Sequence, residues 1–350
     1  MKSLDRKIPM VSVVIPSYNR AGFIVETLNR LFLQTYPNYE VIIVDDASTD
    51  NTEELVKTIF KEQLDSGKLR YEKNEMNMER SFSRNKGVEV ANGELIAFLD
   101  SDDIWQPDHI ERGVEQILIS DCDVFYTFPA YTDKEHTVNT DKVIDERFRI
   151  YVNDLKDFEI DELIARGLIT YPTGMFIRRD IFLESGGFRR DIMVAEDWEL
   201  ISRLYFRYCA KINISFRPTY FIRVHSDNTF DSTRYWEDPF EVIKKGDMTT
   251  YVQDCDFISE ERKKFLIANV LLTRSKIAFA RAMLLTGWKS IMGSIRLDPR
   301  VLLFTRRGIL FFALKRGFIP KKLARGLKRT RNLLSYLIAN NKKLGTSRVK

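Results

Sequence analysis

A repeated alternation of short apolar runs with amphipathic segments is the feature that most constrains the fold of this chain. Apolar runs at 11–15, 40–44 and 95–99 are typical of strands buried on both faces of a sheet. Between them apolar residues recur at helical spacing, and residues 69–72 add one more expected strand. Successive β-α-β units predict an α/β fold with a mostly parallel, doubly wound central sheet flanked by helices. We expect Pro16 to end the first strand.

Polar and acidic clusters follow the predicted strands at 16–19, 45–50 and 100–103. Because ligands bind beyond the carboxyl ends of the strands in open α/β sheets, we expect these clusters to converge on one crevice. The first strand is not followed by a GxGxxG loop, and the sequence holds no GxxxxGK(S/T) motif. Both absences argue against a Rossmann dehydrogenase and a P-loop NTPase.

Three carboxylates, those of Asp100, Asp102 and Asp103, stand together at the end of the run 95–99. They would repel one another at the edge of a buried strand, and a divalent cation would remove that repulsion. Oxygen ligands that include one or two carboxylates suit Mg²⁺ or Mn²⁺ carrying the phosphates of a substrate. The alternative is an acidic loop that caps the helix predicted after Pro107.

Length and composition describe a globular chain with an uneven distribution of charge. Its 350 residues suffice for one large domain or two ordinary ones. Residues 261–350 contain 23 Lys and Arg against 2 Asp and Glu, whereas the first 260 contain 48 acidic against 32 basic residues. The basic region is therefore expected to contact an anionic surface. The three cysteines are widely spaced, which argues against a disulfide framework or a zinc site and fits a reducing compartment.

Four segments, in this order, resemble the motifs of the family 2 glycosyltransferases with a GT-A fold. They read VSVVIPSYNR at 11–20, EVIIVDDASTD at 40–50, SRNKG at 83–87 and GELIAFLDSDD at 93–103. The resemblance extends over roughly residues 10–230. It implies a GT-A catalytic domain over residues 1–235, followed by a basic helical region over residues 236–350.

The resemblance implies a site for a nucleotide-diphospho-sugar. Tyr18 would stack on the base beside the turn at Pro16, Asp46 would accept a hydrogen bond from a ring N–H, and Arg84 would lie near the base or the diphosphate. Core packing for Tyr18 and a solvated helix charge for Arg84 are the alternatives. The full set of residues assigned to nucleotide-sugar binding is Pro16, Tyr18, Asn19, Asp45, Asp46, Arg84, Asp100, Asp103 and Glu196.

The same resemblance identifies Asp100-Ser101-Asp102 as the family's DxD element. It implies Mn²⁺ or Mg²⁺ held by Asp102, although Asp103 stays open as the direct ligand. His225 would complete the ligand set, because a neutral imidazole can coordinate a metal held by too few carboxylates. The other two histidines, His109 and His136, are interpreted as surface or packing residues.

A second acidic pair opens a predicted helix at 195–200. It resembles the family's acceptor-site landmark, in which an acidic pair precedes an aromatic residue. Transfer of a sugar to a hydroxyl requires removal of the proton, and Asp197 is the predicted general base. The alternative is an acid that stabilises the dipole at the start of the helix.

Basic residues surround an apolar stripe after Pro320, a pattern typical of a helix lying in an anionic interface. We predict that residues 301–338 associate with a membrane surface, with packing on the catalytic domain as the alternative. The apolar stretches there are too short to span a bilayer, and no recognised nucleic-acid-binding module accompanies the charge. The N-terminus shows no secretory signal.

The sequence thus predicts an inverting, metal-dependent glycosyltransferase that moves a sugar from a nucleotide-diphospho-sugar, with a UDP-sugar favoured. The acceptor would be a hydroxyl of a glycan or lipid-linked molecule in cell-surface polysaccharide synthesis. The enzyme would be cytoplasmic and peripheral on the inner face of the cell membrane, and would not bind nucleic acid. Two alternatives are a sugar-nucleotide nucleotidyltransferase and a non-catalytic sugar-nucleotide-binding or scaffold protein.

Overall fold

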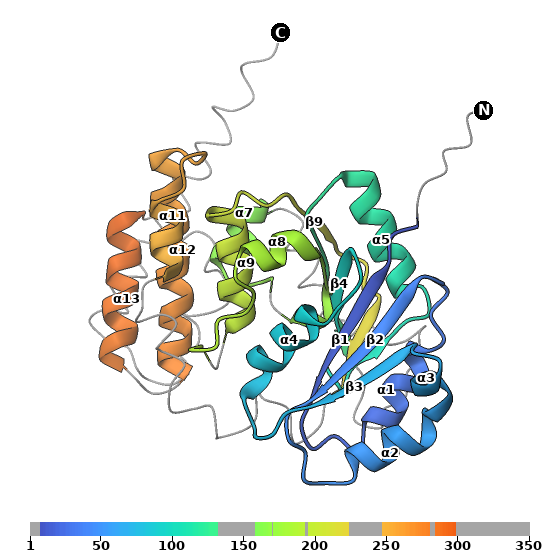
Figure 1. The fold of residues 1–350 in the computed structure, drawn as a ribbon. Helices are drawn as coiled ribbons and strands as arrows, with labels where there is room; N and C mark the ends of the chain where they lie inside the picture. The colour runs from blue at the N-terminus through green and yellow to red at the C-terminus, as the bar shows by residue number, and fades with distance from the viewer. Residues whose placement is uncertain are drawn as a thin grey trace, which may run out of the picture. The chain divides into compact units, whose positions relative to one another are not determined.

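The computed structural model describes residues 8–131, 158–169, 171–192, 195–223, 247–280 and 284–298 (Figure 1). The chain divides into two compact units, Met1–Phe257 and Ile258–Lys350. Several predicted features lie outside the described residues: His136, His225, the boundary at 235/236 and the basic stretch 301–338.

Within the described part of the first unit, seven strands form one sheet in the order β3-β2-β1-β4-β8-β6-β9. Three further strands form a small sheet in the order β5-β10-β7. The strands are β1 (Val11–Ser17), β2 (Tyr39–Asp45), β3 (Leu69–Lys73), β4 (Leu95–Phe98), β5 (Ile104–Trp105), β6 (Val124–Thr127), β7 (Ala130–Tyr131), β8 (Met175–Arg178), β9 (Ile212–Ser215) and β10 (Tyr220–Ile222).

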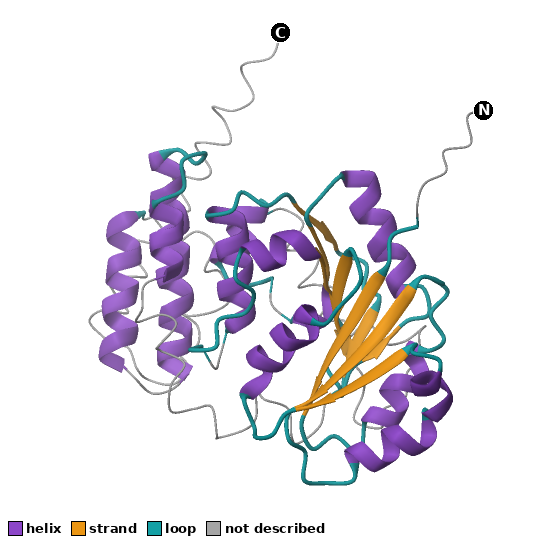
Figure 2. Cartoon of the chain, in the orientation of Figure 1, coloured by secondary structure: helices purple, strands orange, loops and turns teal. Residues whose placement is uncertain are grey.

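The prediction of a mostly parallel sheet flanked by helices is confirmed (Figure 2). β1 pairs in parallel with β2 and with β4, so the order of the strands reverses between β1 and β4. β8 is the exception, because it runs antiparallel to both β4 and β6.

The expectation that Pro16 ends the first strand is wrong. β1 continues to Ser17, and Pro16 stands opposite Val44 of β2. The Ser17 carbonyl accepts from the Asp46 N–H on the β2 side, whereas the Val14 carbonyl accepts from the Leu99 N–H on the β4 side. Backbone groups alternate along a strand, so the Pro16 nitrogen faces β4 beyond the point where that pairing stops. No ladder hydrogen bond is lost there, and the proline is tolerated.

Helices cover both faces of the sheet (Figure 1). In the first unit, the described helices are α1 (Ile24–Leu31), α2 (Thr52–Ile59), α3 (Lys61–Asp65), α4 (Glu79–Glu89), α5 (His109–Ser120), α7 (Ile160–Ala165), the 3₁₀ helix η1 (Pro172–Gly174), α8 (Arg179–Glu184), α9 (Glu196–Phe206) and α11 (Asp247–Gln253). The helix expected after Pro107 is confirmed as α5, and the segments between the apolar runs are helical as expected, forming α1, α2 with α3, and α4.

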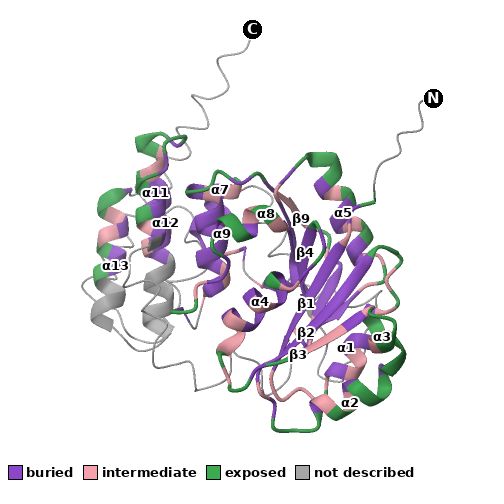
Figure 3. Cartoon of the chain, viewed as in Figure 1, coloured by how far each residue is buried: buried purple, intermediate pink, exposed green. Residues whose placement is uncertain are grey.

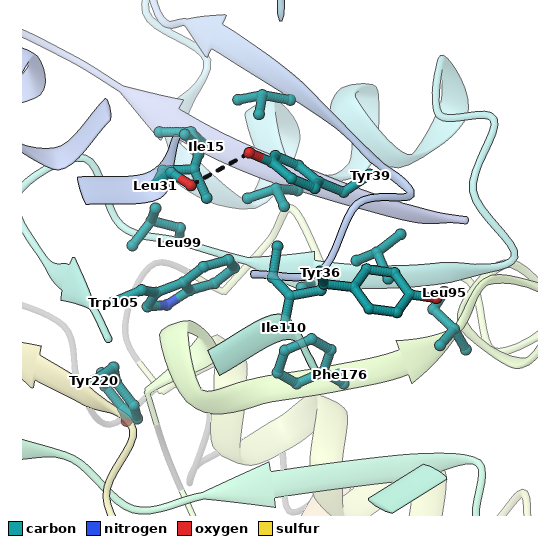
Figure 4. Packing of buried hydrophobic residues seen from close by; sticks show 14 of the residues in the cluster. Ile15, Leu31, Tyr36, Tyr39, Leu95, Leu99, Trp105, Ile110, Phe176 and Tyr220 are labelled. Carbon is teal, nitrogen blue, oxygen red and sulfur yellow. Dashed lines mark hydrogen bonds between the residues drawn. The ribbon is translucent and has the colours of Figure 1, made fainter. Parts of the chain in front are cut away.

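The central strands are buried on both faces, as Figure 3 shows. On one face, α1 and α5 pack on alternate residues of β1, β2 and β4, and Figure 4 shows Trp105, Ile110 and Phe176 in this cluster. On the other face, Phe98 of β4 packs against Phe182 of α8 and against Phe188, with ring centroids 5.6 and 5.3 Å apart. The apolar runs read from the sequence are therefore the core of this unit.

The second unit contains the helices α12 (Glu260–Ala280) and α13 (Leu284–Leu297), which pack against each other. The Ser294 hydroxyl donates to the carbonyl of Ala268, 2.7 Å away, across this helix pair. Among the described helices, none is both long and apolar enough to cross a membrane.

Candidate functional site

A pocket opens at the carboxyl ends of β1, β2 and β4, where the strand order reverses. This is where an open α/β sheet binds its ligands. The predicted convergence of the three strand-end clusters is confirmed. The wall of the pocket consists of Pro16, Ser17, Tyr18, Arg20, Asp46, Asn77, Glu79, Arg80, Ser83, Arg84, Asp100, Ser101 and Asp102.

Asp46 is fixed at one side of this pocket and is only 4% exposed. Its Oδ1 accepts from the side-chain amide of Asn74 and from the Met78 N–H, both at 2.8 Å. These bonds orient the carboxylate. Tyr18, at the end of β1, is partly exposed and lines the same pocket. A planar ring and an oriented acceptor together suit the recognition of a base.

Asn19 and Asp45, two of the predicted binding residues, hold loops together instead of lining the pocket. The Asn19 side-chain oxygen accepts from the Thr49 N–H at 2.8 Å, which joins the loop after β1 to the loop after β2. Asp45 is fully buried and accepts from the Ser48 N–H at 2.8 Å and from the Tyr71 hydroxyl at 2.5 Å. Asn19 and Asp45 therefore support the segments around the pocket through these hydrogen bonds.

Arg84 of α4 joins two acidic groups at the floor of the pocket. Its Nη2 donates to Asp100 Oδ1 at 2.7 Å, and its Nη1 donates to Glu196 Oε1 at 3.0 Å. Arg80, one turn earlier on α4, also pairs with Glu196 Oε1, at 2.7 Å. Burial alone would lower the pKa of Arg84, but Asp100 and Glu196 outweigh it and raise that pKa. The predicted residues Arg84, Asp100 and Glu196 thus form one network.

Asp102 and Asp103 face different surroundings. Asp102 lines the pocket, and its Oδ2 accepts from Arg20 Nε at 3.2 Å. Asp103 is 5% exposed and lies outside the pocket wall, where its Oδ2 accepts from the Thr173 hydroxyl at 2.8 Å. Burial, aided by the charges of Asp102 and Asp100, raises the pKa of Asp103 well above its usual range. Asp102 is therefore the better placed of the two for a ligand in the pocket.

Asp197 lies in the first turn of α9, next to Glu196. Its Oδ2 accepts from the Tyr171 N–H at 3.0 Å and its Oδ1 from the Trp198 N–H at 2.7 Å. Burial, and then the charge of Glu196, raise its pKa to about 6 despite these bonds. Tyr171 and Ala195 have φ values of 71° and 64°, a left-handed conformation that costs free energy in residues other than glycine. Such strain gathers at functional sites.

The short helix η1 connects Asp197 to the DxD loop. Tyr171, its N-cap, holds Asp197, and two residues later the Thr173 hydroxyl bonds both Asp103 and the Asp100 N–H, the latter at 3.2 Å. The Thr173 carbonyl accepts from Trp105 Nε1 at 3.2 Å. One short segment therefore bonds both acidic elements.

The carboxylates present fit a divalent cation bound together with a phosphate ligand. Asp100 and Asp102 both line the pocket, and each is already paired with an arginine cation. The described residues contain no group of three or more His, Cys, Asp and Glu side chains that could hold a metal. Mg²⁺ and Mn²⁺ sites that use one or two carboxylates and complete their shell with substrate phosphates need no such group.

Sequence reasoning missed several pocket residues, most clearly Arg20 and Arg80. Both carried a signal: Arg20 stands within the motif at 11–20, and Arg80 lies four residues before Arg84, on the same helix face. His109, interpreted as a surface or packing residue, is 1% exposed and packs on Trp105 with ring centroids 4.2 Å apart. Burial lowers the pKa of His109 to about 3.

The sequence model described as Glycosyl transferase family 2 matches residues 12–186, half of the chain. The chain belongs to this family. TuaG of Bacillus subtilis, which is named for teichuronic acid biosynthesis, is 38% identical over 119 residues, or 34% of this chain and 46% of TuaG. The chain thus spans about half the length of the curated relatives it matches first.

Solved structures show the same fold at low sequence identity. S. aureus TarS 1-349 in complex with UDP-GlcNAc has a TM-score of 0.62 and is 21% identical, over 83% of this chain and 82% of that one. The mannosyltransferase PcManGT from Pyrobaculum calidifontis in complex with GDP-Man and Mn²⁺ has a TM-score of 0.55 and is 17% identical, over 98% and 89%. The predicted family and fold are both confirmed.

Proposed function

We propose that this family 2 protein is an inverting glycosyltransferase that takes a sugar from a nucleotide-diphospho-sugar. The observation that carries the proposal is the single pocket in which Tyr18, Asp46, Arg84, Asp100 and Asp102 meet. This set offers a ring for stacking, a carboxylate acceptor for a base, an arginine for phosphates and two carboxylates for a metal. The nucleotide sugars named in the TarS and PcManGT structures support the choice of donor.

In this mechanism Tyr18 and Asp46 hold the base, while Arg84 orients Asp100 toward the donor. Asp102 would hold Mn²⁺ or Mg²⁺, with His225 as a further ligand from outside the described residues. When bound, the metal neutralises the charge that develops on the leaving diphosphate. Asp197 takes the proton of the acceptor hydroxyl as that oxygen bonds to the anomeric carbon and the bond from this carbon to the diphosphate oxygen breaks. One displacement of this kind inverts the anomeric centre.

The acceptor class and the cellular location belong to the same proposal. A glycan or lipid-linked acceptor in polysaccharide synthesis is supported by the name of TuaG. We assign the catalytic role to residues 1–235 and contact with an anionic membrane surface to residues 301–338, because basic residues dominate the end of the chain. This arrangement would place the enzyme at the inner face of the cell membrane.

The experiment is a binding and hydrolysis survey of UDP- and GDP-sugars with and without Mn²⁺. Wild type should bind at least one of them in a metal-dependent manner, and Asp102→Ala should lose the metal dependence. Asp197→Asn should bind the nucleotide sugar as wild type does but lose transfer by about 10²–10⁴-fold. Arg112→Gln, which removes an ion pair with Asp108 that lies outside the pocket wall, is the matched control.

Three outcomes would contradict the proposal. Absence of binding for every nucleotide sugar would remove the donor site. Nucleotide release from a sugar 1-phosphate and a nucleoside triphosphate would indicate a nucleotidyltransferase. Binding without hydrolysis or transfer to any acceptor would indicate a non-catalytic binding protein.

A further inference from the structure

Arg20 belongs to the loop after β1 and bonds to the loop after β4, and both loops line the pocket. Its Nε donates to Asp102 Oδ2 at 3.2 Å, and its Nη1 donates to the carbonyls of Tyr18 and Asn19, both at 3.3 Å. Its backbone N–H donates to the hydroxyl of Thr52, the first residue of α2, at 3.0 Å. The guanidinium therefore bridges the base-binding loop after β1 and the DxD loop after β4.

Arg84 pairs with Asp100 and Arg20 with Asp102, and the two pairs differ in the burial of the arginine and in bond length. The Arg84 side chain is 3% exposed, and it bonds Asp100 at 2.7 Å. The side chains of Arg20 and Asp102 are 23% and 17% exposed, and their contact is longer, at 3.2 Å. Charge-assisted hydrogen bonds of full strength measure about 2.7–2.9 Å. The Arg84 guanidinium is thus buried and closely paired, whereas the Arg20 guanidinium is more exposed and its bond to Asp102 is longer.

We propose that the Arg20 guanidinium pairs with Asp102 in the absence of ligands and competes there with the metal. It moves away from Asp102 when a nucleoside diphosphate binds. This inference rests on the proposed donor site and adds a residue to it. A metal ion at Asp102 would repel the adjacent guanidinium, since both are positive. A diphosphate gives the guanidinium a new anionic partner in the same pocket. Arg20 then stabilises the leaving diphosphate and no longer competes with the metal for Asp102.

The consequence is a coupling between metal and nucleotide. Because the nucleotide removes a competitor from Asp102, it should raise the affinity for the metal, and linkage requires the metal to raise the affinity for the nucleotide equally. A partly exposed ion pair contributes about 0–1 kcal/mol. Removing the guanidinium charge should therefore tighten metal binding in the absence of nucleotide by up to about fivefold.

The test measures free Mn²⁺ by electron paramagnetic resonance during titration of the full chain, with no nucleotide, with UDP and with GDP. The variants are Arg20→Gln, Arg20→Met and the charge-preserving Arg20→Lys. Arg189→Gln is the control, because the Arg189 side chain is 29% exposed, close to the 23% of Arg20, and forms an ion pair with Asp191 outside the pocket wall. Unfolding midpoints confirm that each variant is folded.

We expect Arg20→Gln and Arg20→Met to bind Mn²⁺ about threefold to fivefold more tightly than wild type without nucleotide. The nucleotide should then raise their Mn²⁺ affinity by a smaller factor than in wild type, while Arg20→Lys and Arg189→Gln should behave like wild type. Unchanged or weaker Mn²⁺ binding by both neutral variants, in a protein whose wild type binds Mn²⁺ with UDP or GDP, would overturn this inference alone. Absence of Mn²⁺ binding by wild type with either nucleotide would instead overturn the donor site itself.

Discussion

At the scale of single residues, the ionisation of Asp197 gives the most direct test of the proposed chemistry. Burial and Glu196 raise its pKa to about 6, so the carboxylate is ionised and able to accept a proton above that pH. Below about pH 6 it becomes protonated, and the rate of transfer should fall. We expect the pH profile of kcat/KM to show an acidic limb near pH 6, because this parameter reports groups of the free enzyme.

Glu196→Gln tests the origin of that limb. Glu196 is the largest charge-based contribution to the raised pKa of Asp197, so its neutral isostere should move the limb to lower pH. Burial of Asp197 stays in place, so the shift should be partial. A limb that stays where it was, or one that is equally present in Asp197→Asn, would show that another group limits the reaction at low pH.

At the scale of elements, η1 should hold the DxD loop and the start of α9 in position. Thr173 is fully buried, and its hydroxyl is bonded to Asp103 and to the Asp100 N–H. Thr173→Val removes both hydrogen bonds and should cost about 1–3 kcal/mol of the free energy of unfolding, measured by urea denaturation. It should also weaken nucleotide binding. Thr173→Ser restores the hydroxyl and should recover most of both losses, and equal losses in the two variants would exclude a role for the hydrogen bonds.

The crossing of η1 and β6 is tight enough to require glycine at position 174. A Cβ added to Gly174 would lie 2.2 Å from the Thr127 carbonyl oxygen, which belongs to the backbone. Gly174→Ala should therefore lower the free energy of unfolding by about 1–3 kcal/mol. Gly22→Ala is the matched control, since nothing lies within 4 Å of its added Cβ, and its effect should stay within about 0.5 kcal/mol. Similar losses at both positions would contradict the packing of η1 on β6.

These elements also show what the sequence can and cannot predict. β1, α1, β2, β3 and β4 follow from hydrophobic periodicity, because the pattern that defines them is local. β8 lies antiparallel between β4 and β6. This position depends on pairing between distant segments, so it could not be predicted from a local sequence pattern. The same holds within the site: Arg20 meets Asp102 across 82 positions and Arg84 meets Glu196 across 112. The acids and Arg84 could be identified from their motifs, but the pairing of Arg20 with Asp102 and of Arg84 with Glu196 could not.

At the scale of the whole molecule, the charge asymmetry follows the division into units. The pocket and Asp197 lie within Met1–Phe257, whereas 23 of the 55 Lys and Arg residues lie within 261–350. The proposed donor site and the net positive charge therefore belong to different units. This separation allows the two proposed roles to be removed independently.

Deletion of residues 301–350 should abolish membrane association and leave the donor site intact. The full chain should sediment with vesicles that contain anionic lipid, since each basic residue near such a surface contributes about 1 kcal/mol. Binding should weaken as salt rises, because screening shortens the range of these charges. The truncated chain should stay in the supernatant while it binds the same nucleotide with the same dependence on Mn²⁺. Salt-independent sedimentation of the full chain, or sedimentation with neutral vesicles to the same extent, would show that the basic stretch is not an electrostatic anchor.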